Sequence, residues 1–243
     1  MLGILKRAVW AVAPNIAYSV RERREKARAA RPDQRAPAEI FGDIYRDAVW
    51  GGRPGEFNSG LGSDDDVSAD FVSVVRDYIK TNSLTSIVDL GCGDFRVGSR
   101  LLQPGLAYTG VDVVPALVES HQRQHARPGV EFTVADIIDG ELPAGDLYLV
   151  RQVLQHLSNE QISRVLEKLA AKARVIIAEH HPAPDRFKLP NRDKPAGHGI
   201  RVPFGSGVYP DQRPFSFPCR VIATTRVPPI IAPGEVITIY AKA

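Results

Sequence analysis

The stretch from Ser86 to Gly98, which reads SIVDLGCGDFRVG, determines the fold expected for this chain. Its apolar residues Ile87, Val88 and Leu90 are typical of a buried strand, and Val97 to Leu102 continues with helical spacing. The glycines between them, Gly91 and Gly93, let backbone N–H groups approach a ligand at the positive end of the following helix. In an open α/β sheet, a turn of this kind is where a nucleotide-like cofactor binds.

The spacing of the glycines separates two classes of cofactor. A dinucleotide fingerprint requires Gly-x-Gly-x-x-Gly, but Arg96 occupies the third glycine position. The Asp-x-Gly-x-Gly form resembles instead the first motif of class I S-adenosylmethionine (SAM)-dependent methyltransferases. This resemblance implies that SAM contacts the residues of the turn: Asp89, Gly91, Cys92, Gly93, Asp94 and Phe95.

The next two predicted strands also end in aspartate. Asp112 closes the run from Ala107 and lies about twenty residues after the glycine turn, the spacing at which an acidic residue reaches ribose hydroxyls. Asp136 ends the run from Val130, and in methyltransferases of this class that position commonly meets the adenine amino group. We include the neighbouring Val113 and Ile137 in the predicted cofactor site. The alternative is that both aspartates are ordinary surface residues.

A fourth strand, Gly145 to Val150, leads into Arg151 and the sequence Val-Leu-Gln-His156-Leu. This resembles the segment that follows the fourth strand in many small-molecule methyltransferases, and we assign Arg151 to the cofactor site. Ser158 and Gln161 predict a capping box for a helix over 159–171. A fifth strand is expected from Arg174 to Glu179.

The residues before the first strand are rich in aromatic side chains and glycine. We expect Trp50 and Ser59, the latter in a Ser-Gly-Leu-Gly-Ser loop, to cover the cofactor; core packing is the alternative for Tyr45 and Trp50. The aspartates at 64–66 favour the start of a helix.

From Phe41 onward the whole pattern resembles a group of little-characterised bacterial class I methyltransferases, companions of polysaccharide or secondary-metabolite pathways. This implies an α/β, Rossmann-like three-layer sandwich with a mostly parallel seven-stranded sheet whose last strand is antiparallel. It also implies SAM as cofactor and a small molecule or glycan as acceptor, methylated at oxygen. The sequence departs from the group in the Arg-Val-Gly that follows Phe95 and in a substrate half without an assignable motif.

The substrate region is predicted at about 180–217, where prolines and glycines crowd together. A hydroxyl acceptor has to lose its proton, and histidine has a suitable pKa for accepting it. His156, His180 and His181 follow predicted strand ends, and we favour His180 or His181 over His156 as the base. Amine and carboxylate acceptors need no strong base, so the base remains open.

Composition indicates one enzyme domain. The 243 residues, 44% hydrophobic, are enough for one α/β core. Cys92 and Cys219 are far apart in sequence, and no disulfide framework is expected. His121 and His125 share a helix face without a further ligand, so we predict a solvated surface there and no metal site.

The first 37 residues form a basic arm and linker, followed by the methyltransferase domain at 38–243. The net charge is +3, and Met1 to Ile40 carries nine Lys or Arg against four Asp or Glu. An amphipathic first stretch predicts contact with an anionic membrane or a partner; packing on the chain's own domain is the alternative. The stretch fits neither a membrane span nor a signal peptide. We therefore expect a cytoplasmic protein, peripheral at the inner membrane face if the arm binds lipid.

Other functions compete with this interpretation. The arm could serve a nucleic-acid or protein methyltransferase, but its charge is interleaved with acidic residues and no Asn-Pro-Pro-Tyr-type motif follows the fourth strand. An NAD-dependent oxidoreductase would need glycine in place of Arg96. A non-catalytic SAM-fold protein would normally have lost the glycines or Asp112, which are all present.

Overall fold

The computed structural model describes residues 19–20, 23, 27, 35–53, 55–229 and 231–243. Most of the basic arm predicted for 1–37 lies outside the described residues. Helix α3 spans Pro37–Arg46 and has proline in its first turn, where the missing N–H costs no hydrogen bond. No helix in the described ranges is long and apolar enough to cross a membrane.

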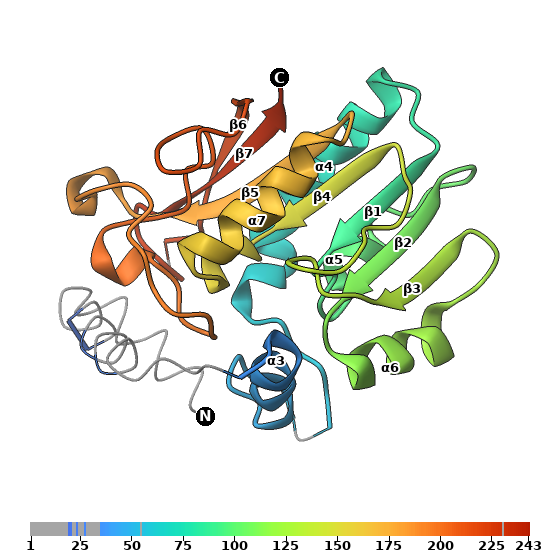
Figure 1. The fold of residues 1–243 in the computed structure, drawn as a ribbon, viewed down its shortest axis with the longest axis horizontal. Helices are drawn as coiled ribbons and strands as arrows, with labels where there is room; N and C mark the ends of the chain where they lie inside the picture. The colour runs from blue at the N-terminus through green and yellow to red at the C-terminus, as the bar shows by residue number, and fades with distance from the viewer. Residues whose placement is uncertain (1–18, 21–22, 24–26, 28–34, 54, 230) are drawn as a thin grey trace.

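A seven-stranded sheet forms the centre of the fold (Figure 1). Its order is β3-β2-β1-β4-β5-β7-β6. The first five are parallel, and β7 is antiparallel to both of its neighbours. The last strand is therefore antiparallel, as predicted. The strands are β1 (Ser86–Leu90), β2 (Ala107–Asp112), β3 (Val130–Val134), β4 (Leu147–Arg151), β5 (Val175–His181), β6 (Cys219–Arg226) and β7 (Val236–Lys242).

Helices cover both faces of the sheet, which confirms the three-layer prediction. Alternate strand residues face opposite ways, so Ile87 packs with the cluster that includes α4 (Asp65–Thr81) and α6 (Pro115–His125), whereas Val88 packs with α7 (Asn159–Ala170). The capping box predicted at Ser158 is present, with the Ser158 side chain accepting from the Gln161 N–H.

The helix after the glycine turn is shorter than expected. α5 spans only Arg96–Ser99, whereas the spacing predicted helix as far as Leu102. The Leu101 N–H donates to the carbonyl of Gly98, a tight 3₁₀-type turn, and Pro104 follows. Pro104 disfavours helical backbone at Gln103, so the helix cannot extend past this point, and the 3₁₀-type turn ends it at Ser99.

β5 is longer than expected. It continues through His180 and His181, which pair with Ile237 and Val236 of β7. These two histidines lie inside a strand, not after one as the sequence predicted. The chain from there to β6 crosses the end of the sheet with only short 3₁₀ turns at Pro184–Arg186 and Val202–Phe204.

Candidate cofactor and methyl-acceptor site

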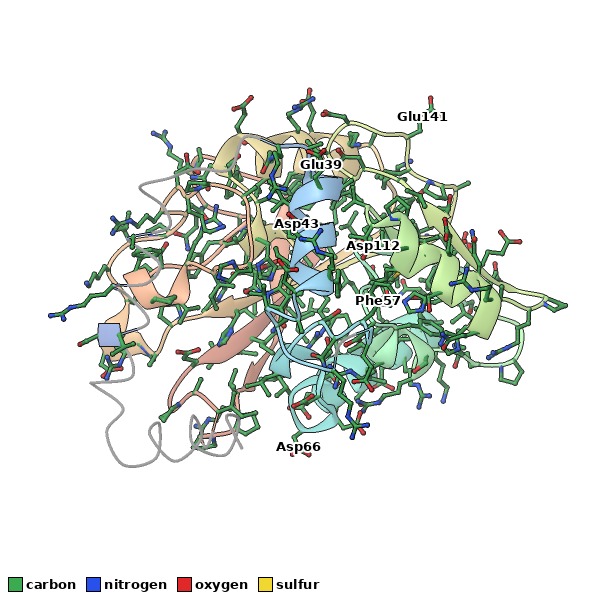
Figure 2. All side chains as sticks on the ribbon, turned by 90° about the horizontal axis from the view of Figure 1, so that it is seen from below. Glu39, Asp43, Phe57, Asp66, Asp112 and Glu141 are labelled. Atoms are coloured by element: carbon green, nitrogen blue, oxygen red, sulfur yellow. The ribbon has the colours of Figure 1, made fainter. Side chains whose placement is uncertain are left out.

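A pocket lies at the carboxyl ends of the parallel strands, beneath α3. Figure 2 shows α3 crossing this edge of the sheet, with Asp112 beside it. The pocket and its open mouth hold about 1060 Å³ of space, part of which is continuous with solvent. It is lined by every residue predicted to bind the cofactor except Phe95, namely Trp50, Ser59, Asp89, Gly91, Cys92, Gly93, Asp94, Asp112, Val113, Asp136, Ile137 and Arg151.

The glycine turn is tightly enclosed. Gly91 has φ +77°, and a Cβ on it would lie 2.5 Å from a methyl group of Val153. Its N–H and that of Cys92 both donate to the carbonyl of Val111, at 2.8 and 2.9 Å. The turn is thereby fastened to β2, and its backbone stays close to the pocket.

Asp112 connects the end of β2 to the same turn. One carboxylate oxygen accepts the Gly93 N–H at 3.1 Å and the other accepts the Val114 N–H at 3.1 Å. The residue is 7% exposed, and burial raises the pKa of Asp112 above its usual value. Each carboxylate oxygen has a second lone pair, so the group can also accept hydrogen bonds from a diol.

His121 supports the turn from below, which corrects the prediction of a solvated helix surface. It is 5% exposed, and its Nε2 lies 2.7 Å from the carbonyl oxygen of Gly93. Because a carbonyl can only accept, Nε2 carries the proton. Burial lowers the pKa of His121, which favours this neutral form.

Phe95 is the predicted cofactor residue that does not line the pocket. Its backbone is left-handed, with φ +63°, and its ring is buried against Phe132 and Tyr108 with centroids 4.9 and 5.2 Å away. A left-handed backbone is uncommon for a bulky residue. Aromatic packing holds the chain in this conformation as it leaves the turn.

Asp136 lies two residues beyond β3, at the mouth of the pocket. One of its oxygens accepts the N–H of Ile138 at 2.8 Å, which fixes the carboxylate beside Ile137. Apolar Ile137 and Ile138 together with an oriented carboxylate suit a flat ring that carries an amino group.

Arg151 is the cationic side chain among the described residues that line the pocket. It donates from Nη2 to the carbonyl of Gly62 at 2.5 Å and lies over the ring of Phe71, whereas its buried Nε has no hydrogen-bond partner. Burial lowers the pKa of Arg151 to about 10, so the side chain remains charged at neutral pH. Nearby Asp89 accepts from the Tyr108 hydroxyl at 2.7 Å, and burial raises its pKa to about 6.

The segment before β1 covers the turn. The hydroxyl of Ser59 lies 2.9 Å from that of Tyr45 and accepts the N–H of Asp94 at 2.9 Å. Arg96 binds the side chains of Asp94 and Asp64 and the carbonyl of Gly60. The residue at the missing glycine position thus fastens the cover instead of making room for a dinucleotide.

An aromatic wall forms the far end of the pocket. The His156 ring lies 5.1 Å from that of Trp50 and 6.4 Å from that of Phe41, between centroids. Its Nδ1 is 3.2 Å from the carbonyl of Gly197, so Nδ1 carries the proton and Nε2 keeps a lone pair. Burial lowers the pKa of His156 to about 3, which makes the ring neutral at physiological pH.

The structure does not bring His180 and His181 into the pocket. Nε2 of His180 lies 2.6 Å from Oε2 of the fully buried Glu235. His181 is hydrogen-bonded at both ring nitrogens, to Thr238 and to the carbonyl of Val208, and its ring stacks on Tyr209. The geometry therefore favours His156 among the three histidines.

Sequence reasoning missed several lining residues. Phe41 is on α3, and Gln152 and Gln155 follow β4 next to residues that were assigned. Gln152 has left-handed backbone, with φ +55°, which no sequence pattern signalled. The two glutamines flank apolar Val153 and Leu154, and no pattern in the sequence marks them as lining residues.

Cysteine and metal chemistry take little part in the described structure. Both cysteines are free. Among the residues described, no group of three or more His, Cys, Asp or Glu side chains is arranged to hold a metal ion.

Residues 88–174 match a family described as "Methyltransferase domain". No curated protein matches the chain. Among solved structures, the N-methyltransferase NodS from Bradyrhizobium japonicum WM9, in complex with S-adenosyl-L-homocysteine (SAH), superposes with a TM-score of 0.52 at 14% identity, covering 76% of this chain and 92% of that one. This likeness shows the fold.

Human N-acetylserotonin methyltransferase in complex with SAM is also similar, with 17% identity, a TM-score of 0.49 and 86% of this chain covered. The present chain spans 60% of that protein's length. Magnesium protoporphyrin IX methyltransferase from Synechocystis PCC 6803, with bound SAH, has 18% identity and a TM-score of 0.49 over 85% of this chain and 97% of that one.

The fold and the domain match agree: residues 88–174 match a methyltransferase domain, and the chain has the fold of a class I methyltransferase such as NodS. The pocket beneath α3 lies at the edge of the sheet where an open α/β fold binds a nucleotide-like cofactor.

Proposed function

We propose that the chain transfers the methyl group of SAM to a hydroxyl oxygen of a small molecule or glycan, and that His156 accepts the hydroxyl proton. The observation that carries this proposal is the imidazole of His156 in the pocket wall, with its proton on Nδ1 and its Nε2 lone pair held by a long hydrogen bond, 3.4 Å, from the Gln155 side-chain amide, which an acceptor hydroxyl would replace.

The pocket residues fit the cofactor. Asp112 has oriented carboxylate oxygens for ribose hydroxyls, and Asp136 can accept from an adenine amino group. The buried, unpartnered Nε of Arg151 suits the carboxylate of the methionine part. A buried donor without a partner is costly, so a ligand that supplies an acceptor gains from it.

When bound, SAM supplies a methyl group already activated on its sulfonium sulfur, and transfer leaves SAH. The chain's own residues then have to align the acceptor, exclude water and receive one proton. Phe41 and Trp50 form a dry wall next to His156. A hydroxyl oxygen becomes strongly acidic as it bonds to the incoming methyl carbon, so even a weakly basic neutral imidazole can take its proton at that stage.

The test uses methyl-labelled SAM and a fractionated cell extract, followed by identification of the labelled product. We expect label on the oxygen of a small molecule or glycan. Label on nitrogen would overturn the choice of oxygen, and label on protein or nucleic acid would overturn the acceptor class. Once the product is identified, His156→Gln should lower kcat much more than His180→Gln. A larger loss of kcat in His180→Gln would indicate that His180, in β5, is the base.

We propose further that the enzyme is cytoplasmic and that its basic N-terminal arm, whose first residues lie outside those described, contacts the inner membrane face. The arm's excess of Lys and Arg over Asp and Glu supports this. The full-length protein should sediment with vesicles rich in anionic lipid at low salt and be released as salt rises, because a Debye length of about 10 Å at 0.1 M screens such contacts. A chain beginning at residue 38 should remain in the supernatant; equal sedimentation of both would contradict the proposal.

A further inference from the structure

His156 lies at the end of a short turn between β4 and α7, and this turn is not part of a longer helix or strand that would fix its position. After β4 the chain forms a 3₁₀ turn at Leu154–His156 and then enters α7 at Asn159. A 3₁₀ turn has poorer hydrogen-bond geometry than an α-helix. The direction of the His156 ring therefore depends on what binds the backbone of this turn.

A buried arginine binds the carbonyl side of the turn. Arg201, only 1% exposed, donates from Nη1 to the carbonyls of Gln155 at 3.1 Å and Leu154 at 3.4 Å. From Nη2 it donates to the carbonyl of Leu157 at 2.8 Å and to Oδ1 of Asn159 at 2.9 Å. The planar guanidinium thus spans the turn from its first residue to the start of α7.

A buried carboxylate binds the amide side of the same turn. Glu179 on β5 is fully buried, and its two oxygens accept the N–H groups of Leu154 at 3.0 Å and Gln155 at 3.1 Å. Burial raises the pKa of Glu179, and the charge of Arg201 acts in the opposite direction. Acceptor oxygens of Glu179 and donor groups of Arg201 therefore hold the two sides of one turn.

The loop that carries Arg201 also binds His156 directly. Gly197 accepts from Nδ1 of the ring and donates its N–H to the His156 carbonyl at 2.9 Å. Nε of Arg201 donates to the carbonyl of Arg192 at 2.7 Å, and this hydrogen bond connects Arg201 to an earlier part of the same loop. The region predicted to bind substrate thus holds the turn after β4.

We propose that Arg201 and Glu179 are positioning residues, which hold the turn at Leu154–His156 so that the His156 ring keeps its proton on Nδ1 and presents Nε2 to the acceptor. This rests on the proposed function of His156. Burying an arginine and a glutamate is expensive, and apolar side chains would fill the same space at lower cost. What they would not supply is a set of donors and acceptors matched to the turn.

The test reads the state of the ring without an acceptor. Protein labelled with ¹⁵N-histidine is examined by NMR in the presence of SAH, with the His156 signals assigned from His156→Gln. In the wild type at pH 5.5 we expect a neutral ring with Nδ1 protonated. In Arg201→Met the ring should exchange between tautomers and become protonated at this pH, since a ring released to solvent titrates near 6.5.

Two further variants make the result specific. Arg201→Lys keeps the charge with fewer donors and should restore part of the wild-type signal. Arg192→Met, a matched substitution of an exposed arginine in the same loop, should leave the signal unchanged. If Arg201→Met does not fold, Glu179→Gln replaces it in the test. In this variant too, the His156 ring should exchange between tautomers and become protonated at pH 5.5.

The proposal is overturned if Arg201→Met or Glu179→Gln lowers the melting temperature while the His156 signals stay as in the wild type, because the two residues would then only stabilise the fold. SAH affinity, measured by calorimetry, should change less than about twofold, since Arg201 and Glu179 hydrogen-bond the turn after β4, whereas Asp112 is held by Gly93 and Val114. A disturbed ring in Arg201→Met together with full methyl transfer by His156→Gln would refute the proposed function of His156 but not the positioning.

Discussion

Ser59 and Asp94 hold each other through two hydrogen bonds: the Ser59 N–H donates to Oδ2 of Asp94 at 2.8 Å, and the Asp94 N–H donates to the Ser59 hydroxyl at 2.9 Å. Ser59 lies in the loop before β1 and Asp94 in the turn after it. The pair therefore joins the cover of the pocket to its floor, and a ligand in the pocket is enclosed by both.

Ser59→Ala should weaken SAH binding about three- to tenfold, since each lost hydrogen bond is worth about 1 kcal/mol and the cover would open more often. Isothermal calorimetry measures the change. Ser99→Ala, which removes an exposed hydroxyl from α5, is the matched control and should bind normally. Equal affinity of both variants would show that the cover does not contribute to cofactor binding.

Asp112→Asn should weaken SAH binding about 10- to 100-fold, because an amide loses the charge-assisted bonds to ribose hydroxyls and turns an N–H₂ group toward a backbone donor. Calorimetry on folded protein, checked by circular dichroism, gives the value. Asp77→Asn on the exposed side of α4 is the control. NAD should give no heat with the wild type; NAD binding in the absence of SAM binding would contradict the cofactor assignment.

Phe95→Gly should be less destabilising than Phe95→Ala, by about 1 kcal/mol. Both variants lose the buried ring, which costs about 3–5 kcal/mol, but only glycine adopts φ +63° without strain. Urea denaturation of both variants at pH 7 provides the comparison. If Phe95→Ala is as stable to urea as Phe95→Gly, or more stable, the left-handed backbone at this position is not retained in the variants.

The free energy of unfolding should decrease as the pH is lowered, because the buried ring of His181 has to become protonated. This side chain is 3% exposed, and burial lowers its pKa to about 4. Its folded pKa is depressed, so its contribution is present above pH 6.5 and is lost as the pH falls from 6.5 toward 4, up to roughly 3 kcal/mol. Urea denaturation at several pH values should show a shallower decline in His181→Gln than in the wild type. Parallel curves would mean that His181 is not buried as a neutral ring.

The parts of the site that sequence reasoning located are those encoded locally. A strand, two glycines and an aspartate at the next strand end occupy fixed places because parallel strands bring their carboxyl ends together. Gly91 and Asp112 could therefore be predicted to meet at one edge. The capping box at Ser158 is local as well, since it spans only one helical turn.

The parts that could not be predicted depend on partners distant in the chain. His180 and His181 were placed after a strand because nothing near them shows that β7 pairs as far as His181. His121 resembles a surface residue by helical spacing, and only the packing of α6 on the glycine turn buries it. Arg201 has no sequence signal at all, because the residues of the turn that it binds lie more than forty residues earlier.

Trp50 donates from its indole N–H to the carbonyl of His198, 148 residues later in the chain. During synthesis the glycine turn and its aspartates are complete long before that carbonyl exists. The aromatic wall and the support of His156 can therefore form only after the loop beyond β5 has been made. A chain ending at residue 174, where the matched family domain ends, would contain the cofactor motifs but lack the supports of its proposed base. If His156 is the base, the smallest unit able to catalyse methyl transfer is larger than the segment that matches the methyltransferase domain.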